Sequence, residues 1–229
     1  MHPAWHRLLR RGGYDLQMPS PWPLELTDGD LLLRPLRRRD RRAFEALLAE
    51  NRDWLRAWDA TDPVGDRARP PFATLLRWTH QQARARAMIP LLITRRGAIL
   101  GQVSASPILY GPQSSAVIGY WVGSAHVGAG IAPRAVALLA DHLFAEAGLH
   151  RIEVNIRPEN AASLRVAEKL HLREEGLRRA FIHVDGAFRD HLSFALTAEE
   201  VATDASGRGV LRRYLAEHHS DGNGHPGAS

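Results

Sequence analysis

The stretch that decides the fold is Ala116-Val117-Ile118-Gly119-Tyr120-Trp121-Val122, followed closely by the turn Val127-Gly128-Ala129-Gly130-Ile131-Ala132. The first run is apolar, β-branched and aromatic, and it has the length of a buried strand. After the glycines, apolar residues recur at spacings of three and four, which predicts a helix with one buried face; they are Ala135, Leu138, Leu139 and Leu143. The predicted order is therefore strand, glycine turn and helix.

The glycine turn has the features of an anion site. The first N–H groups of a helix have no partners within it, and they lie at the positive end of its dipole. Small residues let an anionic group approach this backbone closely; here they are Gly128, Ala129, Gly130 and Ala132. Such a turn is as often only a tight connection, so both interpretations stay open at this point.

A second strand and a second helix follow. Residues 149–156 alternate between apolar and polar side chains, which predicts a strand with one buried face. The polar face carries Arg151, Glu153 and Asn155. Pro158 ends the strand, and Asn160 has the side chain of a helix cap.

A series of motifs now occurs in a fixed order. They are Gly-Tyr-Trp-Val (119–122), Gly-Ala-Gly-Ile-Ala (128–132), His-Arg-Ile-Glu-Val-Asn-Ile (150–156), Arg-Pro-Glu-Asn-Ala-Ala-Ser (157–163), Arg-Glu-Glu-Gly-Leu (173–177) and Asp-Gly-Ala-Phe-Arg-Asp-His (185–191). Together they resemble the GCN5-related N-acetyltransferases (GNAT). Within that superfamily they are most similar to the RimJ-like branch, which acetylates the N-terminal alanine of ribosomal proteins.

The resemblance implies a fold and its boundaries. The fold is α+β, with a mixed, mostly antiparallel sheet of about seven strands that is splayed between strands 4 and 5 and flanked by helices. Residues 1–23 are expected to form an N-terminal extension, 24–200 the GNAT domain, and 201–229 a C-terminal helix and a disordered tail. Within the domain, Pro35 predicts that the strand at 31–36 is an edge, and Asp40 is expected to cap the next helix.

Acetyl-CoA is the cosubstrate that the resemblance implies. Its pantetheine arm would lie between the diverging strands, and its pyrophosphate at the glycine turn. The expected cofactor-binding residues are Trp121, Val122, Val127, Gly128, Ala129, Gly130, Ile131, Ala132, Asn155, Asn160 and Ser163. For Asn160, a plain helix cap remains the competing role. No metal is expected, and the absence of cysteine excludes a thiolate nucleophile.

Direct attack of a neutral amine on the thioester requires a base, donors for the oxyanion and an acid for the departing thiolate. The main-chain N–H near Val122 is the expected oxyanion donor. Many GNAT enzymes have a tyrosine acid seven residues after the asparagine, where this chain has Ala167, so Ser163 is the expected substitute. Glu153 is the expected base and His183 the runner-up, although each of these side chains has a purely structural alternative.

Substrate binding is expected at Trp58, Tyr120 and His183, because the loop at 59–71 and the last hairpin border the acceptor groove in the resembling branch. Trp54 is expected to be a core residue. For Trp58, a core role and a substrate role are equally open.

Charge and composition narrow the partners. Basic residues outnumber acidic ones by 30 to 25, but Lys169 is the only lysine, so much of the skew reflects arginine usage. Arginines crowd residues 34–42, where they either form a solvated surface or attract a ribosomal, RNA-rich partner. No apolar run has the length of a membrane span, so we expect a cytoplasmic protein with no membrane partner and no specific DNA binding.

The sequence therefore predicts an acetyl-CoA-dependent N-acetyltransferase that acts on an N-terminal α-amine, with the N-terminal alanine of a ribosomal protein as the expected acceptor. Two alternatives stay open. One is a GNAT enzyme acting on a small-molecule amine, and the other is a non-catalytic protein that binds acyl-CoA or ribosomal RNA. The sequence does not decide between a monomer and a homodimer.

Overall fold

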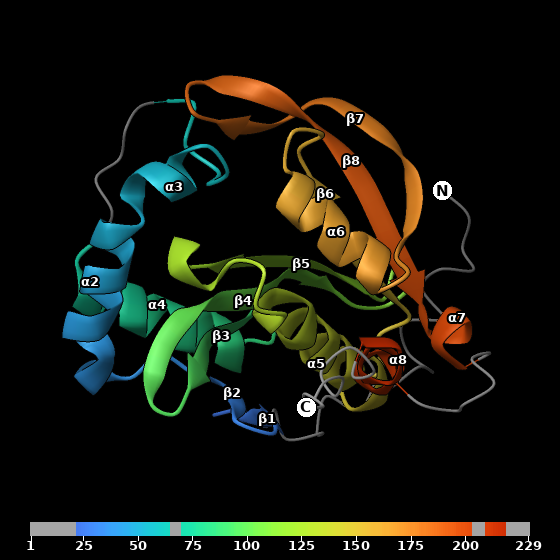
Figure 1. Cartoon of the computed structure of the whole chain (residues 1–229), viewed down its shortest axis with the longest axis horizontal. Helices are drawn as coiled ribbons and strands as arrows, with labels where there is room; N and C mark the ends of the chain where they lie inside the picture. Colours follow the sequence, from blue (N-terminus) through green and yellow to red (C-terminus); the bar gives the residue numbers. More distant parts are fainter. Residues whose placement is uncertain (1–21, 65–69, 203–208, 219–229) are drawn as a thin grey trace, which may run out of the picture.

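A computed structural model describes residues 22–64, 70–202 and 209–218. These residues contain one mixed sheet of eight strands in the order β1-β2-β3-β4-β5-β6-β8-β7 (Figure 1). The strands are β1 (Leu26–Asp28), β2 (Leu31–Arg34), β3 (Ile89–Arg95), β4 (Ala98–Leu109), β5 (Ser115–Val122), β6 (Arg151–Ile156), β7 (Arg173–Val184) and β8 (Ala187–Thr197). The predicted α+β class is confirmed.

The sheet has one strand more than the sequence predicted. The additional strand is β1, which pairs with β2 through a turn containing Gly29 at φ 56°. The prediction that the strand beside Pro35 lies at an edge is therefore wrong, because β2 is paired on both sides. A three-residue strand is too short to show a period in the sequence.

The splayed strands are β5 and β6, the only parallel neighbours in the described sheet. They pair only where Ser115, Ala116 and Val117 face Arg151, Ile152 and Glu153. Beyond these pairs β5 runs on to Val122 and β6 to Ile156 without pairing with each other. This confirms the predicted splay and leaves free main-chain groups on both strands.

Helices follow the predicted order. They are η1 (Arg38–Asp40), α2 (Arg41–Glu50), α3 (Arg52–Arg56), α4 (Phe72–Arg84), η2 (Ser124–His126), α5 (Ile131–Ala145), α6 (Ala161–Lys169), α7 (Ala198–Ala202) and α8 (Val210–His218). The sequence predicted that Asp40 caps α2. Asp40 does precede this helix, but its side chain makes no capping hydrogen bond, so the prediction is wrong. Its carboxylate instead accepts two hydrogen bonds from the buried guanidinium of Arg34, at 2.6 and 2.9 Å.

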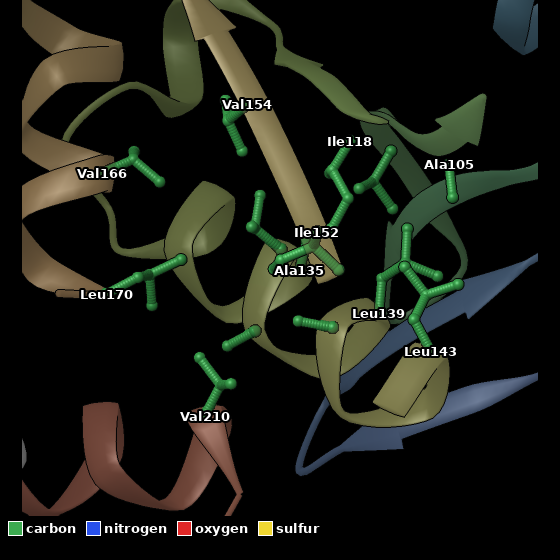
Figure 2. Close-up of a cluster of buried hydrophobic side chains, with 14 of the residues drawn as sticks. Ala105, Ile118, Ala135, Leu139, Leu143, Ile152, Val154, Val166, Leu170 and Val210 are labelled. Atoms are coloured by element: carbon green, nitrogen blue, oxygen red, sulfur yellow. The ribbon is translucent and has the colours of Figure 1, made fainter. Parts of the chain in front are cut away.

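The main core lies between the sheet and α5. Leu139 and Leu143 on this helix are fully buried, and they pack with Ile118 of β5 and Ile152 of β6 (Figure 2). The C-terminal helix α8, which the sequence predicted, adds Val210 to the same cluster. The opposite face of the sheet is covered by a smaller cluster in which Leu92 meets Phe44 of α2 and side chains of α4.

Asp141 on α5 holds the start of α8. Its two carboxylate oxygens accept hydrogen bonds from the main-chain N–H groups of Val210, at 2.6 Å, and Leu211, at 3.1 Å. The predicted N-terminal extension, up to residue 21, and the predicted disordered tail, from residue 219, lie outside the described residues.

The loop after α3 (residues 57–61) contacts the turn end of the β7–β8 hairpin, and we call this connection the arch. Figure 1 shows the hairpin reaching across the splayed strands. Ala60 forms an antiparallel bridge with Val184, and the N–H of Thr61 donates to the carbonyl oxygen of His183 at 2.9 Å. Arg56 and Asp185 add an ion pair at 2.9 Å. The loop after α3 therefore covers the region where β5 and β6 diverge.

Candidate active site

Two cavities meet where β5 and β6 diverge. We call the first, of about 290 Å³, the donor cavity; it lies between the glycine turn, α6 and β5. The second, of about 400 Å³, is the acceptor cavity; it lies between β4, β5, β6 and β8. The two cavities share the lining residues Trp58, Asp59, Tyr120, Trp121, Asn160 and Ser163. A reaction between two bound molecules would occur at this junction.

The glycine turn forms one end of the donor cavity. Gly128 has φ 84°, and Gly130, the N-cap of α5, has φ 70°, which are left-handed conformations that favour glycine. A Cβ at Gly130 would lie 3.3 Å from the hydroxyl of Tyr214, so this position also lacks room for a side chain. No side chain caps the start of α5, and its first-turn N–H groups remain available to an anion.

Cationic side chains on α6 add to this anion site. Arg165 and Lys169 are four residues apart, lie on one face of the helix and line the donor cavity, as does His126 from η2. None of these three residues was predicted from the sequence. The spacing of Arg165 and Lys169 beside the apolar stripe of α6 was a signal that could have revealed two of them.

The predicted cofactor residues are brought together with two exceptions. Trp121, Val122, Val127, Gly128, Gly130, Ile131, Ala132, Asn160 and Ser163 all line the donor cavity. Ala129 belongs to the same turn but is not among the lining residues. Asn155 lines the acceptor cavity instead, where its Oδ1 accepts a hydrogen bond from the hydroxyl of Ser193 at 2.7 Å.

The junction is built around Asn160, Ser163 and Tyr120. The side-chain oxygen of Asn160 accepts from the N–H of Ser163 at 3.1 Å, which confirms the predicted helix cap. Asn160 nevertheless faces both cavities, so capping leaves its amide NH₂ available to a ligand. Burial raises the pKa of Tyr120 to about 12, and its hydroxyl lies 3.5 Å from the carbonyl oxygen of Ser163.

Comparison with known proteins identifies the family. The family described as Acetyltransferase (GNAT) domain matches residues 30–173. This chain belongs to the GNAT acetyltransferase family. Accordingly, it is an N-acetyltransferase whose cosubstrate is acetyl-CoA.

Two relatives extend the similarity over most of the chain, and a third matches part of it. The structure of Mycobacterium smegmatis RimJ in complex with CoA-disulfide is 34% identical, with a TM-score of 0.79, over 86% of this chain and 95% of that one. The [Ribosomal protein uS5]-alanine N-acetyltransferase of Escherichia coli is 26% identical over 82% of this chain and 96% of its own length. The probable N-acetyltransferase YjcK of Bacillus subtilis is 40% identical over 43% of this chain, a match that spans 54% of YjcK.

The donor cavity of this GNAT enzyme fits acetyl-CoA by its chemistry. Open N–H groups at a helix start, with two cations beside them, match a ligand with several phosphates. The unpaired edge of β5 near Trp121 and Val122 offers main-chain groups to an amide-containing arm. No group of three or more His, Asp or Glu residues suited to a metal occurs in the described ranges.

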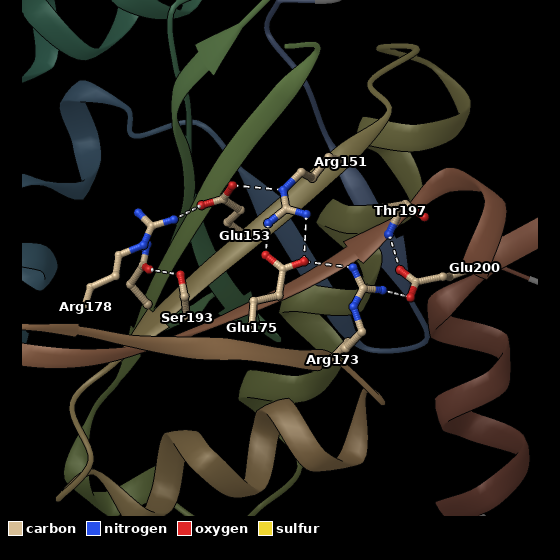
Figure 3. A network of polar contacts seen from close by, with 9 residues as sticks. Arg151, Glu153, Arg173, Glu175, Arg178, Ser193, Thr197 and Glu200 are labelled. Carbon is tan, nitrogen blue, oxygen red and sulfur yellow. Dashed lines mark hydrogen bonds and ion pairs between the residues drawn. The ribbon is translucent and has the colours of Figure 1, made fainter.

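The predicted base Glu153 lies outside both cavities. It faces Val117 in the part of the sheet where β5 and β6 still pair, below their divergence. Its carboxylate accepts hydrogen bonds from Arg151, at 2.9 Å, and Arg178, at 3.1 Å (Figure 3). This geometry does not support Glu153 as the base, because its oxygens are engaged and the reacting groups would lie elsewhere.

His183, the predicted runner-up, also lies outside the cavity linings. Its Nδ1 is 2.7 Å from the hydroxyl of Thr61, and its ring packs on the edge of Phe188. His183 therefore fastens the arch, and the structure supports neither its catalytic nor its substrate-binding role.

The two tryptophans near the arch are both surface residues of the site. Trp54 lines the donor cavity and is 39% exposed, so the predicted core role is wrong. Trp58 lines both cavities and carries the guanidinium of Arg157 over its ring, 5.4 Å from the centroid. Arg157 also donates to the carbonyl oxygen of Ala57 at 2.7 Å, which ties the loop after α3 to the start of α6.

The arginine-dense segment is partly neutralised by the protein itself. Arg34 pairs with Asp40, Arg37 with Glu25, and Arg41 with Glu45.

No helix in the part of the chain that the structure describes has the length and apolar character needed to cross a membrane.

Proposed function

We propose that this acetyltransferase transfers the acetyl group to the N-terminal α-amine of a protein, and that the N-terminal alanine of a ribosomal protein is its acceptor. The observation that carries the proposal is the junction of the two cavities at Asn160 and Ser163, since a donor and an acceptor can approach it from opposite sides. Similarity over more than 80% of the chain to an alanine N-acetyltransferase of ribosomal protein uS5 and to RimJ supports this acceptor.

The donor side binds through the main chain. N–H groups of the glycine turn and of the start of α5 would hold the diphosphate, and Arg165 and Lys169 would add charge. When bound, acetyl-CoA supplies an activated acetyl thioester. The N–H groups of β5 near Val122 would donate to the oxygen on which negative charge develops.

The acceptor side binds through side chains. Gln102, Ser104 and Asn155 provide amides and a hydroxyl, which suit the main-chain groups of an extended peptide end. An α-amine with pKa of about 7.7 to 8 is partly neutral at pH 7, so only modest assistance is needed for its attack.

Ser163 would assist the departing thiolate. It lines both cavities at the start of α6, and the hydroxyl of Tyr120 lies next to it. A thiol has a pKa of about 8.5, so a hydroxyl that donates a hydrogen bond to the thiolate is sufficient. We assign the acid role to Ser163; the neutral Tyr120 hydroxyl lies 3.5 Å from the main-chain carbonyl oxygen of the same residue.

Release of free thiol from acetyl-CoA tests the proposal. A peptide that begins with alanine is compared with the same peptide acetylated at its N-terminus and with a simple primary amine. We expect turnover with the unblocked peptide alone. Turnover with the simple amine but not with the peptide would support a small-molecule acceptor, and binding of coenzyme A without any turnover would support a non-catalytic protein.

A further inference from the structure

We infer that His191 is the general base, which takes a proton from the ammonium group of the acceptor; this inference rests on the proposed function. His191 lies on β8, is only 4% exposed and lines the acceptor cavity. Glu153 and His183, the bases that the sequence predicted, do not line this cavity.

Strand alternation directs His191 to this place. His191 and Ser193 are two residues apart on β8 and share one face. Ser193 pairs with Asn155 of β6 in the sheet and donates a hydrogen bond to it, and Asn155 lines the acceptor cavity. The histidine thus lies one pleat further along β8, beside the same cavity.

A main-chain contact determines which nitrogen can accept the proton. Nδ1 of His191 is 3.0 Å from the carbonyl oxygen of Arg189. A carbonyl oxygen only accepts hydrogen bonds, so in the neutral ring Nδ1 carries the hydrogen and Nε2 has the free lone pair. Phe181 of β7 packs against the ring, with centroids 6.1 Å apart and planes at 76°, which limits its rotation.

The surroundings keep His191 neutral. Burial is the main cause that lowers the pKa of His191, and the positive charge of Arg157 acts in the same direction. The hydrogen bond to the carbonyl oxygen of Arg189 and, more weakly, the carboxylates of Glu159 and Asp190 oppose this, but the net direction is downward from 6.5. At pH 7 the ring is therefore ready to accept a proton. Asp59 and Arg157 also line the cavity; arginine cannot accept a proton, and a carboxylate is ordinarily a weaker base than imidazole.

The proton balance is simple. Nε2 of His191 takes one proton from the ammonium group, and the resulting lone pair of the amine forms a bond to the acetyl carbon as the bond from that carbon to sulfur breaks. The second proton, released from the nitrogen as the amide forms, is equivalent to the one that the thiolate takes up. Imidazolium then returns its proton to water, so the net products are an amide, a thiol and one proton.

The test is the pH dependence of kcat/KM for the alanine-initiated peptide in wild type and in His191→Gln. In the wild type, we expect the acidic limb of this profile, where kcat/KM falls with falling pH because His191 becomes protonated, to lie below pH 6.5. Without it, only the neutral amine can react, so the limb moves up to the amine pKa of about 8. The variant is then about tenfold slower at pH 7, where about a tenth of the amine is neutral, and it approaches the wild type at pH 9.

A matched control is His142→Gln. His142 is also a buried histidine whose pKa is lowered mainly by burial, but it lies on α5, outside the lining of both cavities. This variant should lose stability while keeping the wild-type limb. Thermal unfolding and binding of coenzyme A show whether each variant is folded, and His191→Asn provides a second substitution.

The results of these measurements either support or overturn His191 as the base. A defect that disappears at high pH, and partial rescue of His191→Ala by added imidazole, would support the inference. An unchanged limb in a folded His191→Gln enzyme that turns over the peptide would overturn the inference and leave the proposed function intact. If His191→Gln does not fold, a wild-type limb at the amine pKa overturns it. Absence of peptide turnover by the wild type would overturn the proposed function and this inference together.

Discussion

The donor cavity and the acceptor cavity share one wall but are built from different parts of the chain. The anion end of the donor cavity consists of main-chain N–H groups that a glycine turn exposes at the start of α5. The acceptor cavity depends on side chains from β4, β6 and β8, among them Gln102, Asn155 and His191. A site made of backbone keeps its chemistry when side chains change, whereas a site made of side chains is altered by single substitutions.

The family match includes the whole donor cavity and most of the acceptor cavity. It covers residues 30–173, which include the glycine turn and α6 but end where β7 begins. Of the acceptor-cavity residues named above, Gln102 and Asn155 lie within the match, and only the β7–β8 hairpin that supplies His191 lies beyond it.

The strongest test of the donor side is Gly130→Val. A side chain there requires a left-handed conformation, at a cost of about 1 to 2 kcal/mol, and also meets the hydroxyl of Tyr214. Because the same change narrows the approach of the diphosphate, we expect the Kd for coenzyme A, measured by calorimetry, to rise by about 100-fold.

Gly148→Val is the matched control for this change. Gly148 has φ 63° and open space around it, at the end of α5 remote from the glycine turn. It carries the same backbone cost, so the variant should lose stability but keep its affinity. Equal affinities in the two variants would contradict a main-chain anion site at Gly130.

At the junction, Ser163→Ala should lower kcat by about tenfold while the Kd for coenzyme A stays the same, since a hydrogen bond to a charged group is worth about 1.5 to 3 kcal/mol. Tyr120→Phe, which removes the neighbouring hydroxyl, should have a smaller effect. Single-turnover rates measure both variants. A normal rate in Ser163→Ala together with a slow Tyr120→Phe enzyme would transfer the acid role to Tyr120.

On the acceptor side, Arg157→Gln should raise KM for the peptide by about fivefold and leave kcat unchanged. The substitution removes the stacking on Trp58 and the bond to Ala57, contacts worth about 1 to 2 kcal/mol in partly buried sites. Steady-state kinetics measure the effect. Arg178→Gln removes a similar stacking contact, over Phe181 and outside both cavity linings, and it should leave KM for the peptide unchanged.

The smallest effect is expected away from both cavities, in the ion-pair network of Figure 3. Hydrogen bonds from Arg151 and then Arg173 lower the pKa of Glu175 to about 2 from 4.5. Its contribution to stability is therefore present above pH 4.5 and is lost as the pH falls toward 2. Because the pair is partly exposed, we expect Glu175→Gln to cost about 1 kcal/mol or less at pH 7.

Thermal unfolding from pH 2 to 7 measures this difference, which should shrink at high salt and disappear at the lowest pH. A difference in Tm that persists at pH 2 would show that Glu175 acts through packing instead of charge. At pH 7, kcat/KM of Glu175→Gln should equal that of the wild type.

Local patterns predicted much of the fold. Asp185-Gly186 marked the turn between β7 and β8, and the alternation at residues 151–156 identified the buried face of β6. The failed prediction for Trp54 concerned which surface its side chain faces. Trp54 has a large apolar side chain of the kind found in cores, but α3 is short and places this side chain at the rim of the donor cavity.

Local patterns also do not show which strands lie side by side, which is why the sequence pointed to Glu153 and His183 as bases and not to His191. Alternation placed Glu153 and Asn155 correctly on one face of β6, but it could not show that the strands still pair at Glu153 and have separated at Asn155. The sequence motif that ends at His191 was recognised, yet nothing local distinguished this histidine from His183 on the preceding strand. Only the position of β8 beside β6 makes one of them line the cavity and the other hold the arch.

The sequence by itself determined the strand, glycine turn and helix that form the anion site, because backbone conformation and hydrophobic period are set by neighbouring residues. The tertiary structure alone decided which polar side chains reach the acceptor. That choice depends on contacts between distant segments. The pairing of β8 with β6 brings His191 to a cavity that β4, β5 and β6 complete, whereas β5 and β6 still pair where Glu153 lies.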